Sequence, residues 1–191
     1  MKKTGKIFTL RGTGELVVTT TSTSLGTNEY KLLSYSSPDQ SRAWILRRAY
    51  AWTDNLIGTG GGDSRMLLQM CLSTDFLTPS AGGSLGSVKQ YLSQYSPSDN
   101  RTIGWNAQDQ QERDDGGLDF YLPSNAFKDT TQFIIDENRV ITRDFYLNAY
   151  AQAEGAQITT NIHWLIELEE VVITPTESII QQIKGISQDV G

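Results

Sequence analysis

The chain has 191 residues, of which 38% are hydrophobic and 9% aromatic, a composition that excludes a disordered chain. This length suits one domain, so we predict a single domain over residues 1–191. The net charge of −6 argues against nonspecific clamping of nucleic-acid phosphates, because that binding needs clustered Lys and Arg.

Membrane insertion and disulfide bonding are excluded on similar grounds. No apolar run approaches the roughly 20 residues that a membrane-spanning helix needs, so we expect no membrane partner. The single cysteine, Cys71, cannot form an intrachain disulfide. We therefore expect synthesis in a reducing compartment, the cytoplasm.

The N-terminal segment, residues 1–11, is short and basic. Its four cations precede the first acidic residue, Glu15, and they are Lys2, Lys3, Lys6 and Arg11. Such a patch is a candidate for local contact with nucleic acid. The alternative is a solvated chain end.

Residues 43–53 predict a buried strand that carries both arginine and aromatic side chains. Strict alternation places four large side chains on one face, Trp44, Leu46, Tyr50 and Trp52. Arginine and aromatic residues are enriched at protein interfaces, and they also stack bases and hold phosphates. We predict that Trp44, Arg47 and Arg48 belong to a subunit interface, with nucleic-acid contact as the alternative.

A glycine-rich stretch, residues 58–64, follows this strand. It lacks the Gly-Lys-Ser/Thr ending of a phosphate-binding loop and opens no helix. We therefore predict a hairpin loop that joins the strand at 43–53 to a second buried strand at 65–74.

The acidic stretch 107–117 is predicted to be a loop, because it is polar throughout and ends in paired glycines. Carboxylates in a loop can bind Ca²⁺, which accepts six to eight oxygen ligands in irregular geometry. Asp109, Asp114 and Asp115 are the candidate ligands, and a solvated acidic loop is the alternative. We expect no other cofactor.

Two further strands are predicted at residues 139–151 and 157–171, and we expect them to be neighbours in space. The second has a clear apolar face formed by Ile162, Trp164, Ile166 and Leu168. His163, the only histidine, lies on its polar face. Because no nucleophile motif accompanies His163, we predict that the chain is not an enzyme.

Weaker strand candidates bring the total to eight to ten, and they are KIFTL, GELVVTTT, YKLLSY, TIGW, LDFYL and TQFII. Helical periods are nearly absent between them. Strands of this number and spacing favour an all-β fold, an antiparallel β-sandwich or jelly roll.

One helix is predicted, at residues 174–187. Thr174, Pro175 and Glu177 match the N-cap, first and third positions of a capping box. The isoleucines that follow line one face, and they are Ile179, Ile180, Ile183 and Ile186. A helix of about three turns is marginal alone in water, so this face must pack on the sandwich or on a neighbouring chain.

The segment 133–187 reads FIIDENRVITRDFYLNAY and then, after a spacer, IHWLIELEEVVITPTESIIQQIKGI. Four features resemble the coat proteins of small circular single-stranded DNA viruses: an Ile-Ile-Asp turn, a following strand that carries Arg143 and Asp144 before aromatic residues, an Ile-Glu-Leu-Glu-Glu strand and the capped helix. The resemblance implies an eight-stranded jelly roll with a short C-terminal helix. It also implies that many copies assemble into an icosahedral shell, the virion, after synthesis in a host cytoplasm.

The sequence departs from these coat proteins because it lacks their long Arg-rich N-terminal arm. Single-stranded nucleic acid inside the shell would then be held by the short lysine patch, or the shell would be empty. The alternative function is a carbohydrate- or protein-binding β-sandwich attachment module that uses exposed aromatic residues such as Trp105. That module would be a monomer or a small oligomer.

Overall fold

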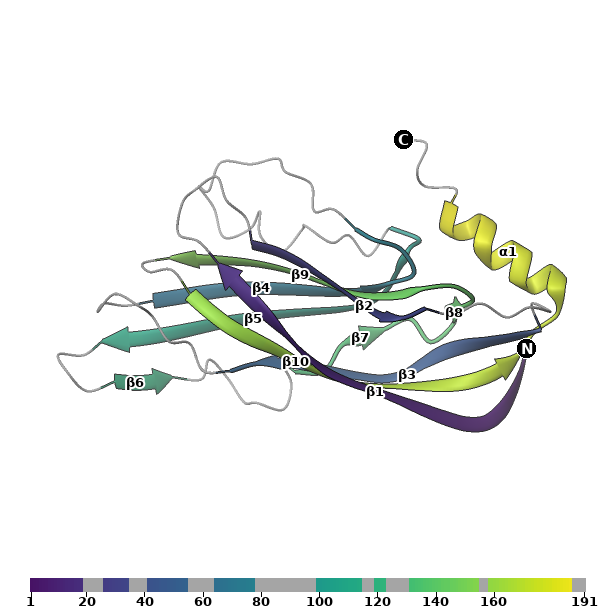
Figure 1. The fold of residues 1–191 in the computed structure, drawn as a ribbon, viewed down its shortest axis with the longest axis horizontal. Coiled ribbons are helices and arrows are strands. Elements are labelled where there is room, and N and C mark those ends of the chain that lie inside the picture. The colour runs from purple at the N-terminus through teal and green to yellow at the C-terminus, as the bar shows by residue number, and fades with distance from the viewer. Residues whose placement is uncertain are drawn as a thin grey trace.

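The computed structural model describes residues 1–18, 26–34, 41–54, 64–77, 99–114, 119–122, 131–154 and 158–186. Within these ranges the chain forms ten strands and one helix (Figure 1). Their bounds are β1 (Lys2–Val18), β2 (Gly26–Leu33), β3 (Arg42–Thr53), β4 (Ser64–Ser73), β5 (Thr102–Asp114), β6 (Asp119–Leu122), β7 (Ile134–Ile135), β8 (Val140–Ile141), β9 (Phe145–Glu154), β10 (Ile158–Val172) and α1 (Pro175–Ile186).

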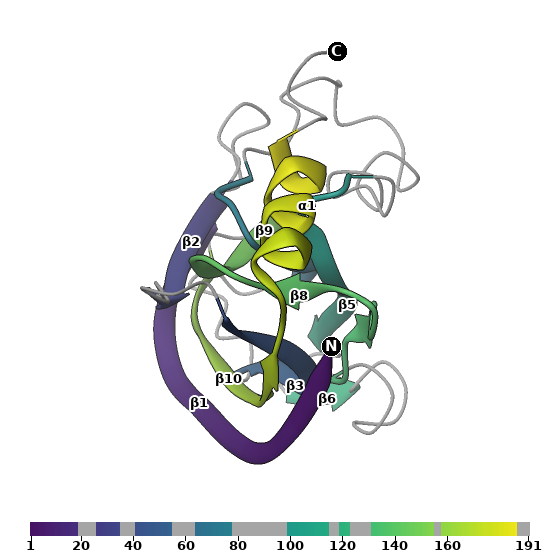
Figure 2. The ribbon, with the colours of Figure 1, turned by 90° about the vertical axis from the view of Figure 1, so that its right-hand side faces the viewer.

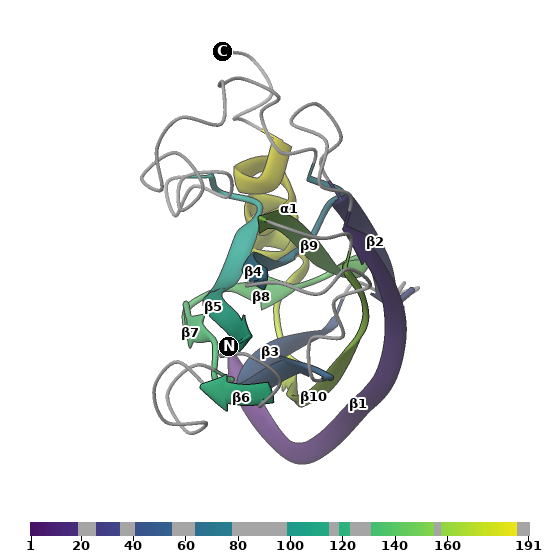
Figure 3. The same cartoon turned by 90° about the vertical axis from the view of Figure 1, so that its left-hand side faces the viewer.

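The strands form two antiparallel sheets. One has four strands in the order β1-β10-β3-β8, and the other has the order β2-β9-β4-β5-β6 with β7 paired to β5. Figures 2 and 3 look along the strands from the two ends and show the sheets as two layers of a sandwich. With β6 and β7 set aside and the other eight strands renumbered in chain order, the order is 1-8-3-6 in one sheet and 2-7-4-5 in the other. This order defines a jelly roll and confirms the predicted fold class.

The core lies between the two sheets and follows from the period-2 alternation of each strand. The predicted apolar face of β10 is confirmed, because Ile162, Ile166 and Leu168 are fully buried and Trp164 packs against them. The facing side chains come mainly from β4 and β9, and they are Leu68, Met70, Leu72, Phe145 and Leu147. Each such side chain contributes about 1.5–3 kcal/mol when it is fully buried.

The prediction that one face of β3 is apolar throughout is wrong for the second half of the strand. Leu46 pairs with Leu168, but Arg48 pairs with Glu167, so Arg47 is an extra residue that forms a β-bulge. After the bulge the alternation reverses, and Ala49 and Ala51 occupy the core positions. Tyr50 and Trp52, which were predicted to face the core, therefore lie on the outer face of the sheet.

Two predicted strand pairings are also wrong. The strands at 43–53 and 65–74 became β3 and β4, which lie in different sheets and form no hairpin, while residues 58–63 lie outside the described residues. Residues 139–151 hold β8 and β9, again in different sheets, and β10 pairs with β1 and β3. The reason is that a period of two fixes which face is buried but does not choose the partner strand.

Candidate functional site

Helix α1 starts with the predicted capping box. The Glu177 backbone N–H donates to Thr174 Oγ1 at 3.2 Å, and Glu177 Oε2 accepts from the Thr174 backbone N–H at 2.8 Å. The N-terminal ammonium of Met1 lies 3.2 Å from Glu177 Oε1. The bond from Thr174 and the ammonium hold the pKa of Glu177 below its ordinary value. Met1 is thus tied to the first turn of α1.

The isoleucine face of α1 is exposed beyond that first turn. Ile173 and Ser178 are buried, but Ile179, Ile180 and Ile183 are 49%, 46% and 57% exposed. Ile186 lies in the helix, and its side chain is outside the described residues. Figure 1 shows α1 leaving one end of the sandwich and standing away from both sheets. About half of each of these three side chains is therefore left open to solvent.

The basic N-terminal segment is part of the sandwich, because it opens strand β1. Lys3 Nζ lies 3.1 Å from Glu169 Oε2, and Lys6 Nζ lies 3.7 Å from Glu170 Oε2. Two of the four predicted phosphate contacts therefore already have carboxylate partners in β10. Lys2 and Arg11 also lie in β1. Nucleic-acid binding by these residues stays a prediction.

Glu170 is the centre of this charged end of the sandwich. Arg42 Nη1 lies 3.0 Å from its Oε1, and the Thr4 hydroxyl donates to its Oε2 at 3.1 Å. Burial acts to raise the pKa of Glu170, but the bonds from Arg42 and Thr4 and the nearby Lys6 outweigh it and hold the pKa below its ordinary value. These contacts join the N-terminus, β3 and β10 at the end where α1 begins.

The predicted interface residues of β3 do not share one surface. Trp44 packs against the core, with its ring centroid 5.8 Å from that of Phe8. Arg47 and Arg48 are exposed at the bulge, and Arg48 Nε lies 4.0 Å from Glu167 Oε2. The two arginines are therefore accessible, and their role in an interface stays a prediction.

The predicted acidic loop is wrong, because β5 continues to Asp114. Asp109 pairs with Leu67 in β4, and Asp114 pairs with Asp119 in β6. Asp115 and the side chains of the other two candidate ligands lie outside the described residues. In the described ranges, no three or more His, Cys, Asp or Glu side chains converge as metal ligands would. Calcium binding stays a prediction.

His163 is at the centre of a cluster on the outer face of the four-stranded sheet. Its Nε2 lies 2.7 Å from Asp54 Oδ1, and its Nδ1 lies 2.9 Å from Thr13 Oγ1. The Asn161 amide also donates to Asp54 at 2.8 Å, and this bond and the one to His163 lower the pKa of Asp54. The Trp52 ring stacks on the imidazole, with the ring centroids 5.7 Å apart.

This cluster has the order hydroxyl, imidazole, carboxylate, which sequence reasoning missed because Thr13 and Asp54 lie far from His163 along the chain. In a hydrolase the carboxylate of such a triad is buried. The side chain of Asp54 is 49% exposed, so solvent weakens its hold on the imidazole. The contacts instead connect β1, β10 and the end of β3 across the sheet.

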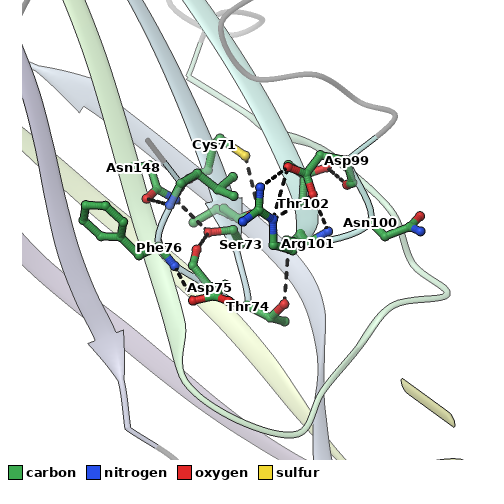
Figure 4. Close-up of polar contacts among 12 residues, drawn as sticks. Cys71, Ser73, Thr74, Asp75, Phe76, Asp99, Asn100, Arg101, Thr102 and Asn148 are labelled. Atoms are coloured by element: carbon green, nitrogen blue, oxygen red, sulfur yellow. Dashed lines mark hydrogen bonds and ion pairs between the residues drawn. The ribbon is translucent and has the colours of Figure 1, made fainter. Parts of the chain in front are cut away.

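A second polar network lies where β4 ends and β5 begins (Figure 4). Arg101 binds both carboxylate oxygens of Asp99, with Nη2 to Oδ2 at 2.8 Å and Nε to Oδ1 at 3.0 Å. Burial acts to raise the pKa of Asp99, but the bonds from Arg101 and the charge of Arg139 hold it below its ordinary value. The Arg139 guanidinium also donates to the backbone carbonyl of Asn100.

The buried side chain of Asn148 continues this network in β9. Its Nδ2 donates to Ser73 Oγ at 2.7 Å and to the Cys71 carbonyl at 3.3 Å, and its Oδ1 accepts from the Leu77 backbone N–H at 3.2 Å. Burial, with the nearby Asp99 charge, raises the pKa of the Cys71 thiol far above its ordinary value. The thiol is therefore buried in its protonated form, and we interpret the network as a structural brace at the junction of β4, β5 and β9.

Trp105, the aromatic residue considered for an attachment surface, packs against a small cluster on the outer face of the six-stranded sheet. The cluster consists of Cys71, Leu77 and Tyr150. Much of the Trp105 ring is thus covered. None of the described helices is long and apolar enough to cross a membrane.

Comparison with known proteins gives no match to a family model and no match to a curated protein. Among solved structures, VP1 of Trichodysplasia spinulosa-associated polyomavirus in complex with GM1 oligosaccharide is similar over 91% of this chain and 98% of its own, with 10% identity and a TM-score of 0.39. An unassembled VP1 pentamer mutant of Washington University Polyomavirus is similar over 85% of this chain and 93% of its own, with 11% identity and a TM-score of 0.31. A structure of Desmodium yellow mottle tymovirus is similar over 88% of this chain and 90% of its own, with 14% identity and a TM-score of 0.27.

These structural neighbours are viral jelly-roll capsid proteins. Their TM-scores all lie below 0.5, so the assignment of the jelly roll to this chain rests on its own strand order. A jelly roll by itself carries many functions.

Proposed function

We propose that this chain is a virus-like coat subunit, many copies of which assemble into a closed icosahedral shell. The observation that carries the proposal is the exposed isoleucine face of α1, held at one end of a jelly roll by a satisfied capping box. A short helix with such a face is expected to bury it against another surface. The resemblance of residues 133–187 to coat proteins of small circular single-stranded DNA viruses supports the same role.

The free energy available from covering the isoleucine face of α1 is small for one contact and large for many identical contacts. Ile179, Ile180 and Ile183 each keep about half of their surface exposed, so covering all three would contribute roughly 2–4 kcal/mol gross per subunit. One such contact is too weak to hold a dimer, because association costs several kcal/mol of lost freedom. A closed shell multiplies the contact over many copies and fixes its geometry by symmetry.

The cargo and the location follow from the same proposal. The particle is the virion, and the subunits are made in a host cytoplasm before assembly. Single-stranded nucleic acid would meet the shell at the β1 cations that have no carboxylate partner in the contacts described above, Lys2 and Arg11. Such a small patch predicts weak, salt-sensitive binding, because affinity for phosphates depends on the number of cations that contact them.

The test changes the isoleucine face and leaves the sandwich intact. The variant I179Q/I180Q/I183Q should stay folded by circular dichroism and thermal melting but should assemble poorly, as should a chain that ends at residue 173. The matched control is I134Q, which makes the same change at an isoleucine that is 76% exposed on β7. Wild-type assembly by the triple variant, or equal loss of assembly in I134Q, would contradict the proposal.

A further inference from the structure

Strand β1 forms one edge of the four-stranded sheet. It is 17 residues long, and its ladder within the described residues runs to β10. Figure 2 shows β1 along the outside of the sandwich, with β10 on its inner side. A long edge strand is a template for pairing with another chain, and proteins usually blunt it.

The backbone groups on the open side of β1 can be identified from two bonds. In an antiparallel pair, opposite residues alternate between exchanging both backbone bonds and exchanging none. Asn161, which lies opposite Glu15, turns its carbonyl toward β3, where it accepts from the Asp54 N–H at 3.1 Å. Glu15 therefore turns its own groups away from β10, and its carbonyl accepts from the Tyr30 hydroxyl at 2.7 Å.

The same alternation applies to every second residue from Glu15 to Ile7, because the register from Ile7 to Val18 is continuous. The N–H and C=O groups of Ile7, Thr9, Arg11 and Thr13 thus also point away from β10. Each of these four side chains is exposed on the outer face.

Both ends of this edge are blunted. At the N-terminal end, Gly5 has a φ of 77°, the register shifts between Lys3 and Ile7, and lysines flank the irregularity. Such bulges and lysines are devices that prevent edge pairing. At the other end, the Tyr30 hydroxyl occupies the Glu15 carbonyl. Between them, Ile7–Thr13 is a regular strand without a lysine or a proline.

We propose that Ile7–Thr13 of β1 pairs antiparallel with the same segment of a second copy, about a two-fold axis at Leu10. This pairing joins two four-stranded sheets into one sheet of eight. It places Thr9 opposite Arg11 and Ile7 opposite Thr13, and every pair brings together the outward-pointing groups of both strands. A two-fold contact requires a self-matching segment, and Ile7–Thr13 meets that condition.

Other registers are less favourable. A register centred on Arg11 sets two arginines opposite each other, which destabilises an antiparallel pair. A register shifted by one residue places outward-pointing groups opposite inward-pointing ones, so the bonds cannot form. Registers centred nearer Glu15 use the carbonyl that Tyr30 already occupies. The Leu10 register uses the whole unprotected segment.

This pairing would be one contact between subunits of the proposed shell, and in that sense it rests on the proposed function. The dimer itself can form without a shell. It is therefore tested in the I179Q/I180Q/I183Q background, where the helix contact is removed. Sedimentation equilibrium should show a monomer–dimer equilibrium. Adding R11P should raise the dimer dissociation constant at least about tenfold, since two symmetry-related N–H groups are lost.

The matched variant is R11A, which removes the side chain and keeps the backbone N–H. It should dimerise as the parent does. R11P should melt close to R11A, because proline is tolerated at an edge position whose N–H points away from the sheet. Equal dimerisation by R11P and R11A, or a parent that is monomeric at all concentrations, would overturn the inference. A shell that fails to form while this dimer persists would count against the proposed function alone.

Disulfide trapping tests the register itself. Opposite residues that exchange backbone bonds have Cα atoms about 5.5 Å apart, within the range that a disulfide spans. A mixture of T9C and R11C chains should give oxidised dimers that contain one of each chain. Either chain alone should give few, because diagonal positions are about 7–8 Å apart. Equal trapping in the single-variant samples would refute the Leu10 register.

Discussion

The ring of Tyr30 occupies the space that a side chain would need at Gly14. A Cβ atom added to Gly14 would lie 2.0 Å from Tyr30 Cε1. The Tyr30 hydroxyl is fixed on the Glu15 carbonyl, and its ring centroid lies 5.2 Å from that of Trp164. The ring therefore closes the gap between β1 and β2, where the two sheets meet, and it can move away only by breaking this bond.

We predict that G14A destabilises the fold by about 1–3 kcal/mol, the usual cost of overpacking a tight contact. Thermal or urea unfolding measures the change. The control is G104A, where the nearest atom to an added Cβ is 3.4 Å away, an ordinary contact. Equal stability of G14A and G104A would show that Tyr30 does not seal this edge.

The Asp99–Arg101 pair should make stability depend on acid pH. The folded pKa of Asp99 lies below its ordinary value of 3.8, so the stability that it contributes is present above that value and is lost as the pH falls through the folded pKa. D99N should cost about 1.5–3 kcal/mol at pH 7 through the lost charged bonds. The free energy of unfolding of D99N, measured in urea, should also fall less steeply below pH 4 than that of the wild type. Parallel plots of this free energy against pH would contradict a stabilising role for the Asp99 carboxylate.

Cys71 should be inert in the native protein. Its side chain is fully buried, and burial raises the pKa of the thiol, which lowers the fraction of reactive thiolate. A thiol reagent such as Ellman's should label the native chain at least about 100-fold more slowly than the urea-unfolded chain. Rapid labelling of a chain with a native circular dichroism spectrum would show that the brace in Figure 4 opens readily.

Calcium dependence remains to be tested through Asp109, Asp114 and Asp115. If they bind Ca²⁺ between subunits, EDTA should loosen assembled particles, and added Ca²⁺ should restore them. D109N/D114N/D115N particles should then be insensitive to EDTA. Indifference of wild-type particles to EDTA removes the ion from the account.

The sequence predicted the buried faces better than the connections. The alternation in β10 identified Ile162, Ile166 and Leu168, and the capping box at Thr174 located α1 to within one residue at each end. The bulge at Arg47 was not predictable, because one extra residue reverses the face of a strand without a signature in composition. Strand partners were missed for a similar reason, since in a jelly roll consecutive strands cross between sheets.

The polar clusters were also beyond sequence reasoning. Thr13, Asp54 and His163 come from separate segments, and only the pairing of β1, β10 and β3 brings them together. Asp99 and Arg101 are two residues apart in sequence, but the nearby charge of Arg139 comes from the segment before β8, which only the fold brings close. The α1 isoleucines were predicted as a contact face, and the structure adds that the described sandwich leaves them exposed.

The most direct measurement of the central claim is the mass of the purified chain by size exclusion with light scattering, followed by negative-stain microscopy of the leading peak. A coat subunit predicts a megadalton species made of uniform spheres. A species near the 21.2 kDa mass of one chain, under conditions that include added Ca²⁺ and single-stranded nucleic acid, would contradict the assignment as a shell-forming protein.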